Sequence, residues 1–152
     1  MRVVFLVVIG TLLLACDSVD HANHTADIQA EAPPRNFTPE LLEAGKTIYE
    51  KHCKRCHGVD AVGSKNWQVQ GPDGKYPAPP LNGTGHTWHH PKAVLIGVIK
   101  NGSPGGMGNM PAMGDKISDD EIEALIAWFQ SLWSEQAYQI WYQYESAHNK
   151  ET

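Results

Sequence analysis

Cysteine is scarce in this chain of 152 residues, which contains three, at positions 16, 53 and 56. A structural zinc site typically draws on a second pair of thiolates, and the chain has no second Cys-x-x-Cys to supply one. Basic residues are also few, with 12 Lys and Arg against 17 Asp and Glu, so the formal charge is −5. A nucleic-acid-binding protein would normally show a basic surplus. No alternating strand pattern and no internal repeat stand out, which favours an all-α fold.

Long apolar runs are missing except at the N-terminus. Residues 1–15 carry one charge, Arg2, and are too short to span a bilayer but have the length of a secretory signal core. They end in Leu-Leu-Ala-Cys, which resembles the lipobox of bacterial lipoproteins. The resemblance implies that 1–15 is a lipoprotein signal peptide and that lipid on Cys16 anchors the protein to the cell membrane, on its periplasmic side. A plain signal peptide with an incidental cysteine, or a retained anchor, are the alternatives.

The residue after Cys16 bears on which membrane holds the anchor. In enterobacterial lipoproteins an aspartate at this position favours the inner membrane, and Asp17 stands there. The same resemblance therefore favours the inner membrane for this chain.

The rest of the chain divides by composition into three segments. Residues 16–36 are polar and Pro-punctuated without apolar periodicity, which predicts a flexible tether. Residues 37–133 have the length of one compact domain. Residues 134–152 form a C-terminal extension, in which Ala137, Trp141 and Tyr144 share helical spacing. We expect a further helix that packs on the domain, with an aromatic patch for partner docking as the alternative.

Helix start signals mark both ends of the predicted domain. Thr38 followed by proline and glutamate predicts a helix that runs up to Cys53. Ser118, followed by three acidic residues, predicts a capped helix over 118–133. A shorter helix is expected within 90–102.

Two loops rich in glycine and proline, 58–90 and 103–116, separate these helices. Loops of this length are unusual in a compact domain unless something organises them. A large buried cofactor would do so.

Cys53, Cys56 and His57 form a Cys-x-x-Cys-His string. A Cys-x-x-Cys pair serves three chemistries: a redox disulfide, half of a zinc site, and covalent attachment of haem. A disulfide suits an oxidising exported compartment but leaves the histidine without a role. Residues three and four apart share one face of a helix, so both thiols and the imidazole can address one flat object. The pattern favours thioether bonds from both cysteines to a haem, with His57 as an axial ligand of its iron.

Methionine is the usual partner of histidine in cytochromes c, where it raises the reduction potential. The loop 103–116 offers Met107, Met110 and Met113. Met110 precedes Pro111, which biases its backbone towards an extended conformation. We therefore predict Met110 as the distal iron ligand, with Met113 and Met107 as alternatives.

Residues 38–133 resemble the class I c-type cytochromes. The resemblance rests on Cys-x-x-Cys-His, on the Met-Pro step before a capped last helix, and on matching helix residues, namely Gly45, Tyr49, Leu125 and Trp128. It implies an all-α class I cytochrome c fold, with few helices and long loops wrapped around one covalent haem c. The family also holds its axial histidine by a proline carbonyl, which implies that Pro79 accepts the other ring N–H of His57.

The resemblance implies an electron carrier rather than an enzyme. Iron closed by His57 and Met110 offers no open position to a small-molecule substrate, and there is no second haem motif. One alternative is a haem enzyme or sensor in which the methionine is displaced. Another is a copper-handling lipoprotein that uses Met107, Met110 and Met113 with the histidines of His86-Thr-Trp-His-His90, since thioether and imidazole suit copper. Those histidines otherwise lie in a surface loop, where Trp88, or Trp67 upstream, is a candidate donor to a haem propionate.

Charge is unevenly distributed along the sequence. Residues 44–116 hold nine basic and four acidic residues, a formal +5, whereas 16–43 sum to −5 and 117–152 to −6. If segments map to surfaces, the haem-bearing side is basic. We then expect redox protein partners that present an acidic docking patch.

Overall fold

The computed structural model describes residues 31–151, so Cys16 and the segment before it lie outside the described residues. The helices of the described part, in chain order, are α1 (Pro39–His52), α2 (Lys54–His57), α3 (Lys92–Asn101), α4 (Asp119–Ser131) and α5 (Glu135–Glu151), with short 3₁₀ turns η2 (Val59–Ala61), η3 (Thr87–His89) and η4 (Pro104–Gly106). Between residues 31 and 151 there is no strand, only one isolated bridge between Tyr76 and Gly108. The predicted all-α fold is confirmed. No helix in this range is both long and apolar enough to cross a membrane.

The two capped helices begin where the sequence predicts. The Thr38 side chain accepts the Leu41 N–H at 3.2 Å, and Pro39 occupies the first turn of α1. Ser118 and Glu121 form a reciprocal capping box at the start of α4, with N···O distances of 3.3 and 2.8 Å. Each cap satisfies backbone N–H groups that have no partner inside the helix.

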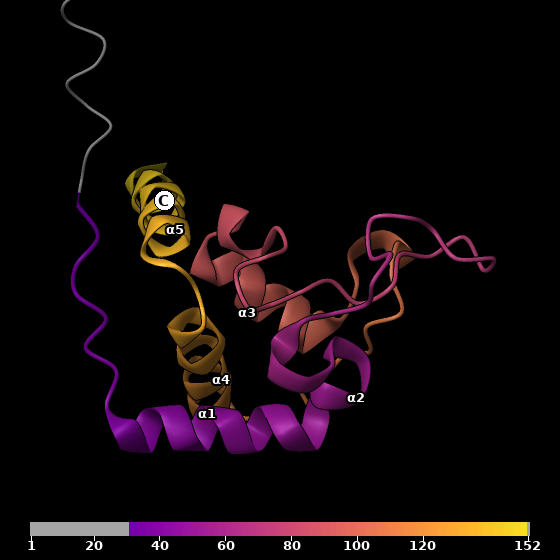
Figure 1. Ribbon diagram of the computed structural model, residues 1–152, viewed down its shortest axis with the longest axis horizontal. Coiled ribbons are helices and arrows are strands. Elements are labelled where there is room, and N and C mark those ends of the chain that lie inside the picture. Colours follow the sequence, from indigo (N-terminus) through magenta and orange to yellow (C-terminus); the bar gives the residue numbers. More distant parts are fainter. Residues whose placement is uncertain (1–30, 152) are drawn as a thin grey trace, which may run out of the picture.

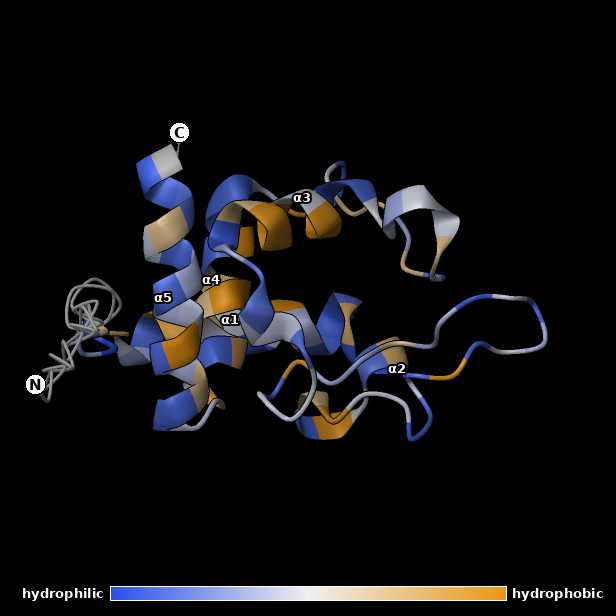
Figure 2. Ribbon diagram, turned by 90° about the horizontal axis from the view of Figure 1, so that it is seen from above, coloured by the Kyte–Doolittle hydropathy of each residue, from blue (hydrophilic) through white to orange (hydrophobic). Residues whose placement is uncertain are grey.

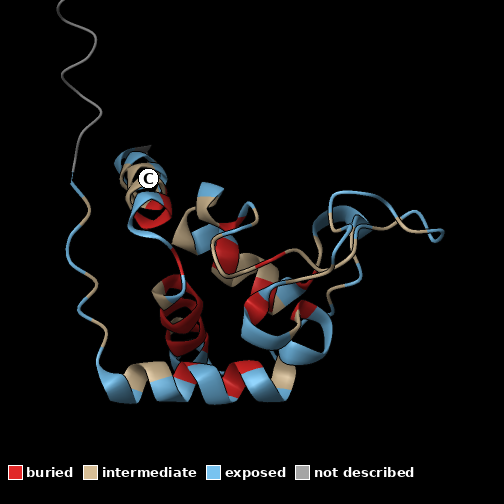
Figure 3. Ribbon diagram, in the orientation of Figure 1, coloured by how far each residue is buried: buried red, intermediate tan, exposed pale blue. Residues whose placement is uncertain are grey.

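α1 lies across one edge of the molecule, and α4 rises from it at a steep angle (Figure 1). Gly45 allows the crossing, since a Cβ there would lie 2.0 Å from the Ala124 carbonyl oxygen and 2.7 Å from the Trp128 Cβ. The rings of Tyr49 and Trp128 pack beside it, 4.3 Å between centroids. α4 is buried along most of its length, whereas α1 buries only one side (Figure 3). The crossing therefore anchors the hydrophobic core.

Apolar side chains of α3, α4 and α5 complete this core (Figure 2). Leu95 and Ile99 face inward from α3, and Trp141 does so from α5. Cys53 and Met110 lie against the same cluster while staying partly exposed. The core thus reaches two of the predicted haem-binding residues.

Hydrogen bonds join the two long loops. The Tyr76 N–H donates to the Met107 carbonyl at 2.8 Å, and the Asn109 amide donates to Asp73 at 2.9 Å. The loop that carries the candidate methionines is therefore tied to the loop that follows the Cys-x-x-Cys-His string.

The described residues of the predicted tether, 31–36, include Arg35, which contacts the folded body. The Arg35 guanidinium donates to the carbonyls of Gln130 and Trp133 at 2.9 and 2.8 Å and pairs with Glu135 at 2.9 Å. It also lies 4.5 Å from the centre of the Tyr138 ring. Arg35 thereby satisfies carbonyls at the end of α4 and holds the N-terminal segment beside α5, away from α2 (Figure 1).

Candidate haem site

The Cys-x-x-Cys-His string forms one helical turn at the end of α1. Cys53 ends α1, and its carbonyl accepts the N–H groups of Cys56 and His57 at 3.1 and 3.0 Å. These bonds give the one-face spacing on which the haem prediction depends. Cys53 is half-buried, Cys56 is exposed and His57 is buried, so the three side chains stand at the border between core and solvent.

His57 is oriented by a single backbone carbonyl. Its Nδ1 lies 2.8 Å from the Pro79 oxygen, the contact that the family resemblance implies. Because a carbonyl can only accept, Nδ1 carries the proton and Nε2 keeps the lone pair. Burial lowers the pKa of His57, which favours the neutral ring. A neutral imidazole with a fixed tautomer and a free Nε2 is the form that binds iron.

The two thiols are free cysteines with unequal surroundings. Burial, and secondarily the neighbouring Cys56, raise the pKa of the Cys53 thiol to about 11. Reactive Cys-x-x-Cys motifs in redox enzymes instead lower a thiol pKa to stabilise the thiolate. The site therefore fits a pair of thiols held for thioether bonds better than it fits a disulfide oxidoreductase.

Close backbone packing holds the segment after His57. The Tyr49 hydroxyl donates to the Gly58 carbonyl at 2.6 Å, which joins α1 to the residue after the ligand. Gly63 has a positive φ of 68°, and a Cβ there would lie 2.3 Å from the Pro80 nitrogen. Only glycine meets both conditions without strain. The loop therefore lies directly on the proline pair that orients His57.

The three candidate methionines differ in environment. Met107 is 59% exposed, whereas Met113 is 7% exposed and belongs to the core. Met110 is intermediate, and Ser103 binds it on both sides: Met110 N–H donates to the Ser103 hydroxyl, and its carbonyl accepts the Ser103 N–H, each at 3.1 Å. The Met110 side chain thus stays partly exposed while hydrogen bonds hold its backbone.

A family model described as cytochrome c oxidase, cbb3-type, subunit III, matches residues 40–129. The chain belongs to this family of c-type cytochromes. It is 29% identical over 113 residues to a cbb3-type cytochrome c oxidase subunit CcoP of Azospirillum brasilense, covering 74% of this chain and 36% of that protein. It is 34% identical over 88 residues to a CcoP subunit of Azospirillum sp. (strain B510), covering 58% of this chain and 27% of that protein.

The chain thus spans about a third of the length of the curated relatives it matches. No solved structure matches it at a significant level. The matched range contains all five residues predicted around the haem, namely Cys53, Cys56, His57, Pro79 and Met110. It ends before Trp133 and α5. The family accounts for haem c as the cofactor of the domain.

His86 and His90 flank η3, and His89 lies within it. No group of three or more His, Cys, Asp or Glu side chains between residues 31 and 150 is placed to hold a metal ion. The rings contact aromatic neighbours: His86 stacks on Trp67, with centroids 5.0 Å apart, and His89 meets Trp88 edge-on at 3.8 Å. The cluster therefore contributes to the packing of η3.

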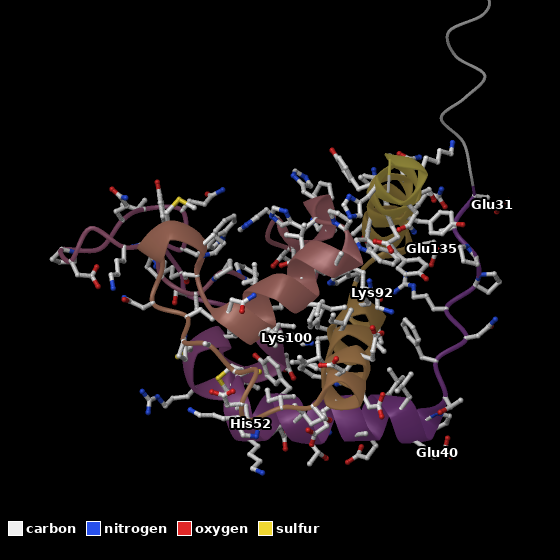
Figure 4. All side chains as sticks on the ribbon, turned by 180° about the vertical axis from the view of Figure 1, so that it is seen from behind. Glu31, Glu40, His52, Lys92, Lys100 and Glu135 are labelled. Carbon is white, nitrogen blue, oxygen red and sulfur yellow. The ribbon has the colours of Figure 1, made fainter. Side chains whose placement is uncertain are left out.

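Two ion pairs join the basic middle segment to the acidic segment that follows it. Lys100 of α3 pairs with Asp119 of α4 at 2.6 Å, and Lys92 pairs with Glu123. Figure 4 marks both lysines on α3. The fold brings acidic residues of α4 beside basic residues of the middle segment. Exposed Lys54 and Arg55 lie next to the cysteines predicted to bind haem, so positive charge is also present at that edge.

Two residues that contact the proline segment were missed by the sequence analysis. Thr87 donates to the Pro80 carbonyl, and the Trp133 ring N–H donates to the Leu81 carbonyl. No motif marks either residue, because each acts through a partner distant in sequence. Only a prediction of three-dimensional contacts would have found them.

Proposed function

We propose that this chain is an electron carrier with one haem c, attached through thioether bonds at Cys53 and Cys56, with His57 and Met110 as axial ligands of the iron. Such a haem supplies a one-electron redox couple. The single observation that carries the proposal is the buried His57 with Nδ1 on the Pro79 carbonyl, one turn from two free thiols. The half-buried Met110, on a backbone fixed by Ser103, supports the choice of distal ligand.

The protein side chains have three tasks in this function. The cysteines fix the edge of the porphyrin, His57 holds its lone pair towards the iron, and Met110 closes the opposite face against small substrates. With both axial positions filled, we propose that the chain is not an enzyme.

The names of the relatives suggest where the carrier acts and which protein accepts its electrons. Both curated proteins are named as subunits of a cbb3-type cytochrome c oxidase. We propose that this chain passes single electrons between redox proteins at the periplasmic face of the membrane, with an oxidase of that type as one acceptor. Lys54 and Arg55, exposed beside Cys56, fit an acidic docking site on such a partner.

Covalent attachment is tested by extraction. When the protein is made together with haem-maturation machinery, acid–acetone treatment should leave the haem on the polypeptide, because thioether bonds survive it. The double variant Cys53→Ser/Cys56→Ser should release all its haem, and each single variant should keep one bond. Release of the colour from the wild-type protein would contradict the thioether assignment.

Anchoring through Cys16 is tested by fractionation. We propose that lipid on Cys16 holds the protein at the membrane, since one anchored cysteine needs no other apolar segment. The variant Cys16→Ser should move the haem-loaded protein from the membrane to the soluble fraction without changing its spectrum. A variant that stays with the membrane would point to an uncleaved residue 1–15 segment or to the aromatic face of α5.

A further inference from the structure

The segment Pro79–Leu81 is held at three successive carbonyl groups. The Pro79 oxygen accepts from His57 at 2.8 Å, the Pro80 oxygen accepts from the Thr87 hydroxyl at 3.1 Å, and the Leu81 oxygen accepts from the Trp133 ring N–H at 2.7 Å. The donors come from three separated parts of the chain. Each of the three donor residues is buried, His57 at 6%, Thr87 at 6% and Trp133 at 3% exposure.

The backbone of this segment is also restricted by its sequence. A proline ring fixes φ near −65°, and the residue before a proline is confined to extended conformations. Pro79 and Pro80 therefore leave the segment few alternative shapes. The Leu81 N–H donates to the buried Ala61 carbonyl at 2.8 Å, which ties the segment to the turn after His57. The segment Pro79–Leu81 is therefore a stiff strip of backbone. The position of this strip decides where the Pro79 oxygen lies.

Helix α5 supports the two donors other than His57, namely Thr87 and Trp133. η3, which carries Thr87, packs against α5, with the His89 and Tyr144 rings 5.8 Å apart. Trp133 precedes α5 directly, and its ring lies 6.2 Å from that of Trp141. Gly83 approaches the Trp133 backbone so closely that a Cβ would lie 3.1 Å from the Trp133 Cα. The extension that follows the family match thus packs around the strip that orients His57.

We propose that Thr87 and Trp133 are positioning residues for the axial histidine: through the Pro80 and Leu81 carbonyls they fix the Pro79 oxygen against His57 Nδ1, and α5 holds both in place. The inference rests on the proposed role of His57 as iron ligand. A histidine that donates a strong hydrogen bond from Nδ1 is a more electron-rich ligand, which stabilises oxidised iron. Loosening the strip weakens that bond and raises the reduction potential.

Two single substitutions test the role with little change of shape. Thr87→Val removes the hydroxyl, and Trp133→Phe removes the ring N–H. Each leaves one carbonyl of the strip without its donor, which loosens the strip. In the reduced haem-loaded protein, hydrogen exchange of the His57 Nδ1–H, followed by NMR, should accelerate on the order of tenfold in each variant, and the reduction potential should rise.

The chain offers matched controls. Thr87→Ser keeps the hydroxyl and should restore wild-type exchange and potential. Trp141→Phe removes a ring N–H that has no hydrogen-bond partner among the described residues, from a side chain just as buried, 7% exposed. It keeps an aromatic ring against Trp133, so α5 still supports that residue, and it breaks no hydrogen bond to the strip. Circular dichroism confirms that each variant keeps its helices, and Thr87→Val decides alone if Trp133→Phe does not fold.

The outcomes separate this inference from the proposed function. Faster exchange and a higher potential in Thr87→Val and Trp133→Phe, but not in the two controls, support the positioning role. If both variants match Trp141→Phe while the wild-type protein carries covalent His/Met haem, the positioning role is overturned and the carrier function stands. A wild-type chain without covalent haem would instead overturn the proposed function and this inference together.

Discussion

Replacing Gly45 by alanine is expected to cost the protein about 3 kcal/mol or more of its free energy of unfolding, towards the upper end of what overpacking does in protein cores. The new methyl group would meet the Ala124 carbonyl at 2.0 Å and the Trp128 Cβ at 2.7 Å. The first is backbone and the second is the fixed root of a side chain, so neither can rotate away. α1 and α4 must therefore move apart, which weakens the packing contacts along the whole crossing.

The measurement is guanidinium unfolding of the haem-loaded protein, followed by circular dichroism. Domains of this size have about 5–15 kcal/mol of stability, so the loss should be plain in the transition midpoint. Ala44→Gly is the matched control, because it makes the reverse exchange at the neighbouring exposed position of α1. It should cost about 1 kcal/mol through helix propensity alone. Equal midpoints for Gly45→Ala and the wild type would show that the crossing is not as tight as the distances indicate.

Local signals in the sequence predicted most of the helical framework. Thr38 and Ser118 cap helices at the expected residues, because a cap depends on side chains within three positions of it. The one-face arrangement of Cys53, Cys56 and His57 follows from the helical repeat for the same reason. Such features need no knowledge of the rest of the fold.

Most contacts between residues distant in sequence could not be predicted from the sequence alone. The Arg35 guanidinium donates to the Gln130 carbonyl 95 positions away, although the sequence alone placed Arg35 in a tether. Lys100 meets Asp119 because α3 lies beside α4, and segment charges cannot reveal this. No pattern distinguishes such a residue from an exposed one, since its partner is chosen by the packing of whole helices.

The contact between His57 and Pro79 joins residues distant in sequence, yet it was predicted from a family resemblance. Twenty-two positions separate the two residues, so no local rule connects them. A family resemblance implied the contact because relatives keep such a carbonyl in place. The same resemblance assigned no role to Thr87 or Trp133, whose bonds to the next two carbonyls had to come from the structure.

The second large effect is expected from Met110→Ala. Loss of the thioether should remove the absorption band at the red edge of the visible spectrum that marks His/Met ligation in oxidised cytochromes c. The reduction potential should fall on the order of 0.1 V or more, within the ~0.8 V range that axial ligands span. The direction follows because methionine opposite histidine raises the potential, and water or another oxygen or nitrogen donor in its place favours oxidised iron.

Burial makes the neighbouring methionines matched controls. Met113 is buried in the core, so Met113→Ala should keep the red band and the potential but lower the free energy of unfolding by about 2–5 kcal/mol. Met107 is largely exposed, and Met107→Ala should change neither property. We thus expect Met110 to affect the spectrum, Met113 to affect stability and Met107 to affect neither.

The pattern across the three variants identifies the ligand. If Met113→Ala removed the red band and Met110→Ala kept it, the distal ligand would be Met113, and its side chain would have to leave its place in the core. If no variant changed the band, a residue other than methionine would complete the iron site, and the closed axial position that argues against an enzyme would lose its support. The expected result leaves Met110, on the backbone that Ser103 fixes from both sides, as the residue that closes the distal face.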